Sequence, residues 1–182
     1  MSDYLFDERG WLKEVRSVPS PNCDERPQPG ADLLVIHAIS LPAGIYEGDD
    51  VEALFTNTLC TARSPDYADL ANLRVSAHFF VRRDGSLTQF VSVDERAWHA
   101  GISQFDGRTG CNDFSVGIEL EGVDHAPFKD AQYAVLEPLV RALLTRFPSI
   151  TVQRIAAHSD IAPGRKRDPG PCFDWSRLLG HL

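Results

Sequence analysis

Two stretches of the chain have the hydrophobic pattern of β-strands. Leu33–His37 is a short apolar run that contains β-branched residues and ends in a histidine. Such a run is typical of a strand that is buried in a sheet. Ser115–Gly122 instead alternates, with Ile118 and Leu120 on one face and Glu119 on the other. Because side chains alternate across a strand, this segment is predicted to place an acidic group on the face opposite an apolar one.

Four further segments are predicted as strands: near 11–15, and at 75–81, 86–91 and 152–157. Asp84 and Gly85 lie between the second and third of these, and an Asp-Gly pair between β-rich runs indicates a tight hairpin turn. The fourth delivers His158 directly after its end. Residues 1–30 are polar and proline-rich and are expected to form an extended lead-in that belongs to the same domain.

Helical periodicity is strongest over 130–147, where apolar residues recur every three or four positions. Asp130 is its expected N-cap. Pro138 interrupts the pattern, and since a proline inside a helix costs about 3 kcal/mol, a kink or a split into two helices is expected there. Asp50 is the expected cap of a short helix at 51–55. Loops are expected at 41–50 and 103–113, and a last short helix at 173–179.

Strands mixed with a long helix predict one α/β domain with a mixed central β-sheet flanked by helices. The chain has 182 residues, which is enough for one domain with its own core. No apolar run approaches the roughly 20 residues that a membrane helix needs. The acidic N-terminus also lacks the basic and then apolar pattern of a secretory signal, so a cytoplasmic protein without a membrane partner is expected.

Charge and cysteine content narrow the class of function. The net charge of −8 argues against nucleic acid as a partner, since proteins that bind nucleic acid usually have a basic face. The cysteines are widely spaced and form no C-x-x-C pair: Cys23, Cys60, Cys111 and Cys172. They are therefore expected to be reduced thiols rather than metal ligands.

The segment His158–Pro171 carries a histidine, a lysine and an aspartate, and its prolines and glycines predict a defined, non-helical loop. His37 ends one predicted strand and His158 follows another, so both imidazoles meet at one sheet edge if the strands are neighbours. Asp168 then returns on the loop. Two or three histidines with a carboxylate are typical of catalytic zinc sites. Spacing alone does not decide the set, and the other histidines stay open as ligands: His78, His99, His125 and His181.

Two further side chains are candidates for catalysis. Glu119 lies on a half-buried strand face, where burial would raise its pKa towards that of a general base. A salt bridge to an arginine is the alternative, and Glu121 on the same face is equally eligible. Lys166 lies two residues before Asp168 and would stabilise a developing oxyanion if it projects into the site. Its alternative is an ordinary surface lysine.

Seven motifs follow one another in the chain: Val35–His37, Leu73–His78, Arg83–Gly85, Ala97–Gly101, Cys111–Gly122, Asp130–Tyr133 and His158–Pro171. In this order they resemble the zinc-dependent N-acetylmuramoyl-L-alanine amidases, a superfamily that includes the peptidoglycan recognition proteins. The resemblance runs from about residue 10 to the C-terminus. It implies the fold of that superfamily, with the amidase domain at 31–182.

The resemblance implies one Zn²⁺ ion held by His37, His158 and Asp168. It implies that Glu119 activates or orients a water molecule and that Lys166 stabilises the tetrahedral oxyanion. Four residues are implied to lie along the substrate: Arg74, Trp98, His99 and Ala100. The resemblance assigns no catalytic role to Glu121, His78 or the cysteines.

Two positions depart from the family's pattern. Ala38 follows the first zinc histidine, where an asparagine is usual, and Gly110 precedes the Cys-Asn-Asp motif, where a basic residue is usual. Arg108, two residues before Gly110, is a candidate to supply the missing charge. Both departures concern contacts with the substrate and leave the chemistry unchanged.

The function expected from this resemblance is hydrolysis of the amide bond between 1,6-anhydro-N-acetylmuramic acid and L-alanine in cytoplasmic muropeptides. The partner is then a small soluble muropeptide, and a monomer is expected. One alternative is an amidase that acts on intact peptidoglycan, like autolysins and endolysins. The other is a module that binds muropeptide without cleaving it, which the presence of all three ligands disfavours.

Overall fold

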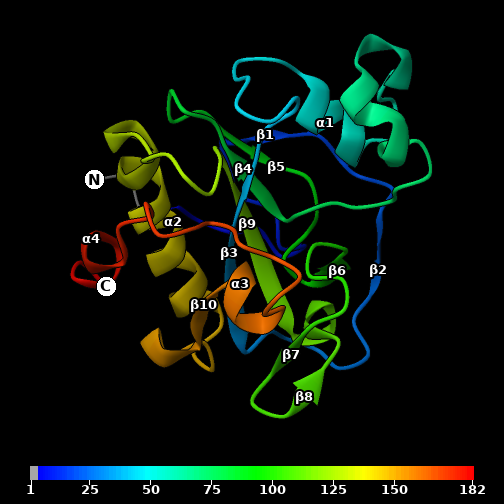
Figure 1. Cartoon of the computed structure of the whole chain (residues 1–182). Helices are drawn as coiled ribbons and strands as arrows, with labels where there is room; N and C mark the ends of the chain where they lie inside the picture. The colour runs from blue at the N-terminus through cyan, green and yellow to red at the C-terminus, as the bar shows by residue number, and fades with distance from the viewer. Residues whose placement is uncertain (1–3) are drawn as a thin grey trace.

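A six-stranded mixed sheet forms the centre of the molecule, as expected from the sequence (Figure 1). The computed structural model describes residues 4–182. The strand order is β1-β5-β4-β9-β3-β10. In chain order these strands are β1 (Arg16–Ser17), β3 (Leu33–Ile39), β4 (Phe79–Val81), β5 (Leu87–Gln89), β9 (Ser115–Glu121) and β10 (Ile155–Ala157).

Strand directions set the position of the site. The central strand β3 pairs in parallel with both β9 and β10, and β4 pairs in parallel with β9. Strand β5 runs antiparallel to its neighbour β4, through the hairpin predicted around Asp84 and Gly85, and β1 pairs in parallel with β5. The carboxyl ends of β3, β9 and β10 therefore lie at one edge of the sheet, where parallel α/β sheets usually carry their ligand sites.

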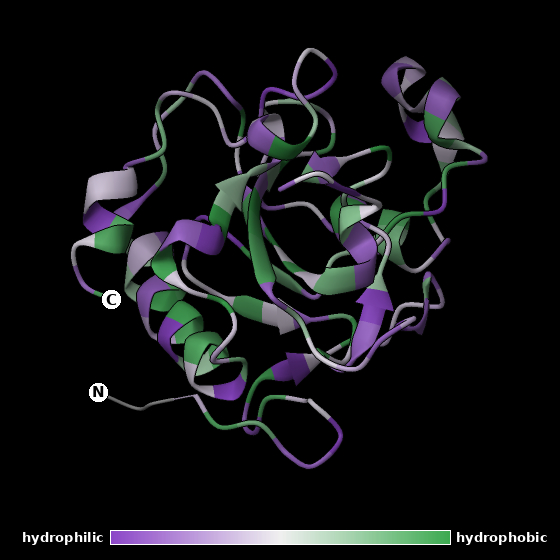
Figure 2. Ribbon diagram, turned by 90° about the horizontal axis from the view of Figure 1, so that it is seen from below, coloured by the Kyte–Doolittle hydropathy of each residue, from purple (hydrophilic) through white to green (hydrophobic). Residues whose placement is uncertain are grey.

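The two faces of the sheet are covered by different elements. Helix α2 (Asp130–Arg146) lies along one face and buries alternate residues of β3 and β9, among them Leu34, Ile36 and Ile118. Figure 2 shows hydrophobic positions along this helix. Leu33 and Val35 point to the other face, where they pack with the loop before β9 and with a short helix after β10. His37 and Glu119 share this second face because side chains alternate along a strand.

Helix α2 differs from the prediction in two respects. Its N-cap is Lys129, one residue before the expected Asp130. The helix also continues through Pro138, so the predicted split is wrong. Proline removes the backbone bond to the carbonyl of Ala134, but Ala134 is exposed, and water can satisfy that group. Burial of the apolar residues that follow, such as Leu139 and Leu143, offsets the loss.

The shorter helices begin close to the predicted residues. Helix α1 (Asp50–Phe55) starts with Asp50, which is not a cap but a buried acceptor for Arg63 and Tyr67. The C-terminal helix α4 (Trp175–Leu179) begins after Asp174, whose carboxylate accepts the backbone N–H of Arg177. Three 3₁₀ turns outside the site complete the helical elements: η1 (Thr61–Arg63), η2 (Pro65–Leu70) and η4 (Val152–Arg154).

Several small β elements were not predicted. The strand expected near 11–15 is wrong: this stretch holds turns and a single bridge between Phe6 and Leu12, and β1 begins at Arg16. The lead-in and the loop at 103–113 instead contribute to two small antiparallel pairs. These pairs are β2 (Cys23–Glu25) with β6 (Glu95–Ala97), and β7 (Gln104–Phe105) with β8 (Arg108–Thr109).

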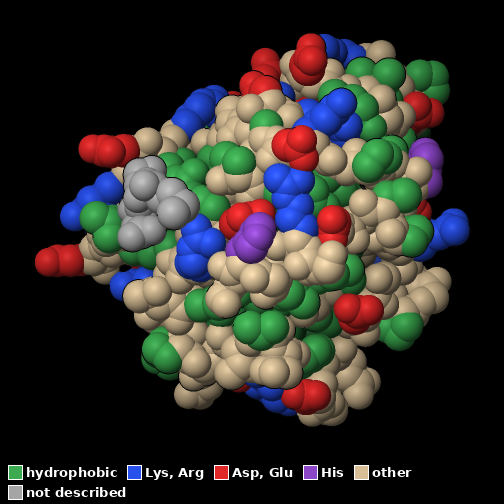
Figure 3. All heavy atoms as spheres, turned by 90° about the vertical axis from the view of Figure 1, so that its left-hand side faces the viewer, with side chains coloured by type: hydrophobic (Ala, Val, Ile, Leu, Met, Phe, Trp, Pro, Cys, Tyr) green, Lys and Arg blue, Asp and Glu red, His purple; other side chains and the backbone are tan. Residues whose placement is uncertain are grey.

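Charged side chains cover much of the surface of the molecule. On the face that carries α2 and α4, acidic and basic side chains alternate with small hydrophobic patches (Figure 3). Over residues 4–182, no helix has both the length and the apolar character needed to cross a membrane.

Candidate metal centre and active site

The two predicted histidine ligands are neighbours because their strands are neighbours. His37 is on β3, opposite Glu119 of β9 in the register. His158 directly follows β10, whose last residue Ala157 pairs with Ile36. The two Nδ1 atoms are 2.9 Å apart although the residues are 121 positions apart in the chain. The parallel pairing of β3 and β10 thus brings the imidazoles of His37 and His158 together.

Asp168 completes the cluster from a loop that the backbone holds in place. Residues His158–Ile161 form a one-turn helix, α3, so the prediction that this segment has no helix is wrong over its first turn. The loop then returns, and the carbonyl of Asp168 accepts the N–H of Ser159 at 3.0 Å. Gly170 has a φ of 84°, and a Cβ there would lie 1.9 Å from the carbonyl oxygen of Asp124, so only glycine fits.

The three ligand atoms have the spacing that one metal ion requires. Asp168 Oδ2 lies 3.0 Å from His158 Nδ1 and 3.5 Å from His37 Nδ1. All three atoms lie within 4.8 Å of one another. A tetrahedral zinc ion with bonds of about 2.0–2.1 Å would separate its ligand atoms by about 3.4 Å. This trio therefore suits a metal with two imidazole ligands, one carboxylate ligand and an open position.

The ionisation of the trio also suits a metal. Burial lowers the pKa of His37 to about 4, so its imidazole is neutral at pH 7 and has a lone pair to donate. Burial alone would raise the pKa of Asp168, but its hydrogen bond with His158 outweighs burial and holds that pKa well below its usual value. The site thus offers a neutral imidazole on His37 and a carboxylate on Asp168, which are the forms that bind metal.

Glu119 differs from Glu121 although both lie on the same face of β9. Glu119 is buried, its Oε1 lies 3.9 Å from His37 Nδ1, and its Oε2 has no hydrogen-bond partner among the described residues. Burial, with Asp168 nearby, raises its pKa well above the usual value. Glu121 is instead held by the backbone N–H groups of Glu47 and Arg83. Of these two glutamates, Glu119 is therefore the candidate for exchanging a proton beside the candidate ligands.

Lys166 is exposed and makes no ion pair with any described residue. It lines a cavity of about 380 Å³ together with Asp168 and Ala38. Of the trio, Asp168 lines this cavity, and the charge of Lys166 also acts on His37 and Glu119 behind it. A candidate metal trio, a buried carboxyl and an exposed cation thus lie close together, a combination that suits hydrolysis of an acyl group.

Comparison with known proteins places this site in a family. The model of the N-acetylmuramoyl-L-alanine amidase family matches residues 26–171. The chain belongs to this family. It is 53% identical to the 1,6-anhydro-N-acetylmuramyl-L-alanine amidase AmpD of Citrobacter freundii over 175 residues, which are 96% of this chain and 92% of that protein. The chain is accordingly an amide hydrolase.

Solved structures of amidases share the fold. A crystal structure of an AmpD selenomethionine derivative aligns with a TM-score of 0.94 and 50% identity, covering 98% of this chain and 99% of that one. Escherichia coli AmiD, in complex with its substrate anhydro-N-acetylmuramic acid-L-Ala-D-γ-Glu-L-Lys, aligns with a TM-score of 0.63 and 32% identity, covering 97% of this chain and 65% of that one. The predicted single α/β amidase fold is confirmed.

The predicted substrate residues of the Trp98–Gly101 segment lie at different depths. Trp98 is half-buried, and its indole N–H donates to Asp24. His99 is only 8% exposed, and both its ring nitrogens contact protein atoms. Ala100 is fully buried and presents its carbonyl to Arg165 and His158. The ring of His99 and the carbonyl of Ala100 thus face the candidate ligands from within the protein.

The two predicted arginine contacts have different surroundings. Arg108 pairs with Asp32 at 2.6 Å and stacks on Phe114, at the starts of β3 and β9, whereas His37 lies towards the end of β3. The structure does not bring Arg108 to the metal ligands. Arg74 is exposed and donates only to backbone carbonyls, so its charge is available to a ligand. Contact of either residue with substrate stays a prediction.

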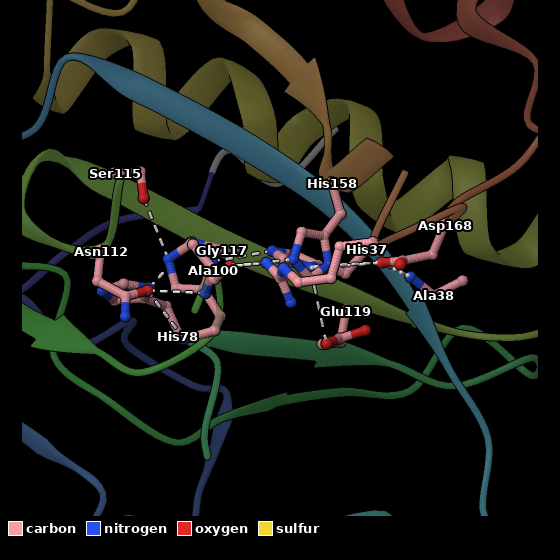
Figure 4. Close-up of polar contacts among 12 residues, drawn as sticks. His37, Ala38, His78, Ala100, Asn112, Ser115, Gly117, Glu119, His158 and Asp168 are labelled. Atoms are coloured by element: carbon pink, nitrogen blue, oxygen red, sulfur yellow. Dashed lines mark hydrogen bonds and ion pairs between the residues drawn. The ribbon is translucent and has the colours of Figure 1, made fainter. Parts of the chain in front are cut away.

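Several residues around the ligands were not selected from the sequence. They are Asn112, Ser115, Gly117 and Arg165, and Figure 4 shows the first three beside the histidine cluster. The sequence carried a signal for two of them, because Ser115 and Gly117 are spaced two residues apart from each other and from Glu119 and therefore lie on the same face of β9.

Proposed function

We propose that this chain is a zinc-dependent amidase that cleaves the bond between 1,6-anhydro-N-acetylmuramic acid and the L-alanine of the stem peptide. The observation that carries the proposal is the trio His37, His158 and Asp168 beside the buried Glu119. The fine specificity is supported by relatives of about half identity over nearly their whole length, which are named for this bond.

A zinc ion held by the trio would supply Lewis acidity and lower the pKa of water towards 7. Glu119 accepts the proton as a water molecule attacks the lactyl carbonyl carbon, because its carboxyl is buried and has an unpaired oxygen. Lys166 stabilises the negative charge that develops on the carbonyl oxygen. Glu119 then transfers the proton to the departing amine of alanine. The carbon–nitrogen bond breaks, leaving a carboxylate on the sugar and a free amino group on the peptide.

The substrate is proposed to be a small soluble muropeptide that is turned over in the cytoplasm as part of cell-wall recycling, by a monomeric enzyme. An amidase of intact peptidoglycan is the second candidate, because the chain is also 39% identical to AmiD of Escherichia coli, which is named an N-acetylmuramoyl-L-alanine amidase without reference to an anhydro sugar. The complex of AmiD contains an anhydro-sugar peptide. Recognition of the anhydro sugar alone does not separate the two, so the comparison must include polymeric substrate.

Mass analysis of the products from a defined anhydromuropeptide tests this proposal. The expected products are the free peptide and the anhydro sugar, formed by the zinc-loaded protein and abolished by a chelator. Intact sacculi, tested in parallel, should release little peptide. Faster cleavage of sacculi than of muropeptide would favour the second candidate, and cleavage that survives complete metal removal would contradict the zinc assignment.

A further inference from the structure

A chain of hydrogen bonds runs from His37 into the protein, and its direction is fixed at the far end. The hydroxyl of Ser115 donates to the carbonyl of Cys111 at 2.6 Å. It therefore accepts from His99 Nε2, which lies 3.1 Å away. A neutral imidazole has one N–H, so His99 Nδ1 is an acceptor. Its partner at 2.8 Å is His37 Nε2, which must be the donor.

This direction leaves His37 Nδ1 unprotonated and aimed at Asp168 and His158. A histidine metal ligand usually donates its other ring N–H to a fixed acceptor, which sets its tautomer and orientation. Here that acceptor is another histidine, which is only 8% exposed and is fixed through its other ring nitrogen by Ser115.

The ring of His99 fits because residue 117 has no side chain. A Cβ on Gly117 would lie 2.5 Å from the ring carbon Cγ of His99 and 2.6 Å from its Nδ1. The backbone of Gly117 has no positive φ, so glycine is required there for space and not for conformation. The strand β9 is thus shaped to seat this ring next to His37.

The same segment supports the second histidine ligand. The carbonyl of Ala100 lies 3.3 Å from His158 Nε2 and also accepts from Arg165 at 2.6 Å. Asn112, in the 3₁₀ turn η3 (Cys111–Phe114), fastens the segment, because its side-chain oxygen accepts the backbone N–H groups of both His99 and Ala100. Figure 4 shows Asn112, Ala100 and Ser115 lined up with the ligands.

We propose that His99 is a positioning residue that fixes the metal-binding tautomer of His37, with Ser115 and Gly117 setting the tautomer and the place of its ring. The inference rests on the proposed zinc function, and it revises the expectation that the His99 side chain contacts substrate. The segment Trp98–Gly101 would then act through the zinc ligands.

Substitutions at residue 99 distinguish the role of Nδ1 of the His99 ring from that of Nε2. The amide oxygen of Asn reaches the place of Nδ1, so His99→Asn keeps an acceptor for His37, whereas the longer Gln reaches only the place of Nε2. Zinc dissociation constants, measured by competition with a chromophoric chelator, should be near wild type for His99→Asn. They should rise about 10- to 100-fold for His99→Gln and His99→Phe. Equal affinities for the Asn and Gln variants would overturn the proposal.

Ser115→Ala tests the direction of the chain two hydrogen bonds from the metal. Without its acceptor, His99 can take the Nδ1–H tautomer, which cannot accept from His37. Zinc affinity should fall about 2- to 10-fold, the value of one hydrogen bond. Ser20→Ala is the matched control, because Ser20 is also buried and donates to a backbone carbonyl, that of Phe55, but takes no part in the hydrogen bonds that lead to His37. Equal zinc affinities for the two variants would contradict the inference.

Nitrogen NMR of the imidazole rings gives a readout that needs no activity. In the zinc-loaded wild type, His37 and His99 should both carry their proton on Nε2, and an Nδ1–H tautomer of His99 would overturn the proposal. His37→Ala separates this inference from the proposed function. If wild type binds no more zinc than His37→Ala does, the zinc function itself fails. If wild type binds zinc tightly but residues 99 and 115 have no effect, only the positioning role fails.

Discussion

Two glutamates on one face of β9 show how local contacts assign a role to a residue. Glu121 has both oxygens occupied by backbone N–H groups, so its carboxylate is structural. Glu119 has one oxygen 3.9 Å from His37 Nδ1, its other oxygen has no hydrogen-bond partner among residues 4–182, and burial raises its pKa. The difference lies in the loops that contact each carboxylate, which alternation along the strand cannot reveal.

Replacing Glu119 by Gln should therefore remove proton transfer and leave zinc in place. We expect hydrolysis of an anhydromuropeptide to fall about 10²- to 10⁴-fold, the usual value of a positioned general base. Glu121→Gln is the control: it should lower the free energy of unfolding but keep kcat. Turnover and bound zinc are measured on the same samples, and near-normal turnover by Glu119→Gln with full zinc would exclude it as the base.

Lys166 is an exposed cation without an ion pair among residues 4–182, next to Asp168. Lys166→Ala should keep zinc and reduce kcat about 10²- to 10³-fold, as for loss of one oxyanion donor. The neighbouring Arg167 is also exposed and lies near Asp124, so Arg167→Ala is a control for net charge. Equal effects of the two substitutions would mean that Lys166 acts only through the general field of the loop.

At the scale of elements, one ion pair joins the small β2–β6 pair to the segment behind the ligands. Asp24 on β2 accepts two hydrogen bonds from Arg96 on β6 at 2.6 Å and one from the indole of Trp98. The hydrogen bonds from Arg96 hold the pKa of Asp24 below its usual value. A carboxylate with a depressed pKa stabilises the fold above its unfolded pKa of about 3.9, and this contribution is lost as the pH falls through the folded value.

Asp24→Asn should therefore lower the free energy of unfolding at pH 7, by no more than about 1 kcal/mol because the pair is partly exposed to solvent. The difference from wild type should shrink steadily below about pH 4. Urea unfolding at pH 7, 5 and 3 measures it. Asp69→Asn, at an exposed aspartate, should give no difference at any of these pH values. If the free energies of unfolding of wild type and Asp24→Asn differed as much at pH 3 as at pH 7, the ion-pair interpretation would be contradicted.

The strands and helices with strong hydrophobic patterns were predictable, since β3, β9, α1, α2 and α4 follow from local sequence. The strands β2, β6, β7 and β8 were missed because each has only two or three residues and forms through its partner. The trio of ligands followed from strand ends and the family resemblance. The supporting role of His99 did not, because it depends on how the segment after β6 packs against Ser115 and Gly117 of β9, which local sequence does not specify.

At the scale of the whole molecule, the site joins parts of the chain that are distant in sequence. His37 comes from the central strand, His158 from the end of β10, and Asp168 from the loop that follows α3. A ligand that binds all three at once favours only the folded arrangement of these parts. Metal binding by the proposed trio would thus be coupled to global stability.

Zinc should consequently raise the melting temperature of the wild-type protein. At a free zinc concentration about 100 times the dissociation constant, the stabilisation is about 2.7 kcal/mol, or about 5–10 °C for a domain of this size. His158→Ala should show no such response, whereas Ser20→Ala should melt lower but keep the full zinc increment. Differential scanning fluorimetry over a series of buffered zinc concentrations provides the measurement. The increment depends on zinc concentration only through binding to the folded state. If the melting temperature of the wild type does not change across the series, or if that of His158→Ala rises with zinc as much as that of the wild type, the trio does not hold the metal.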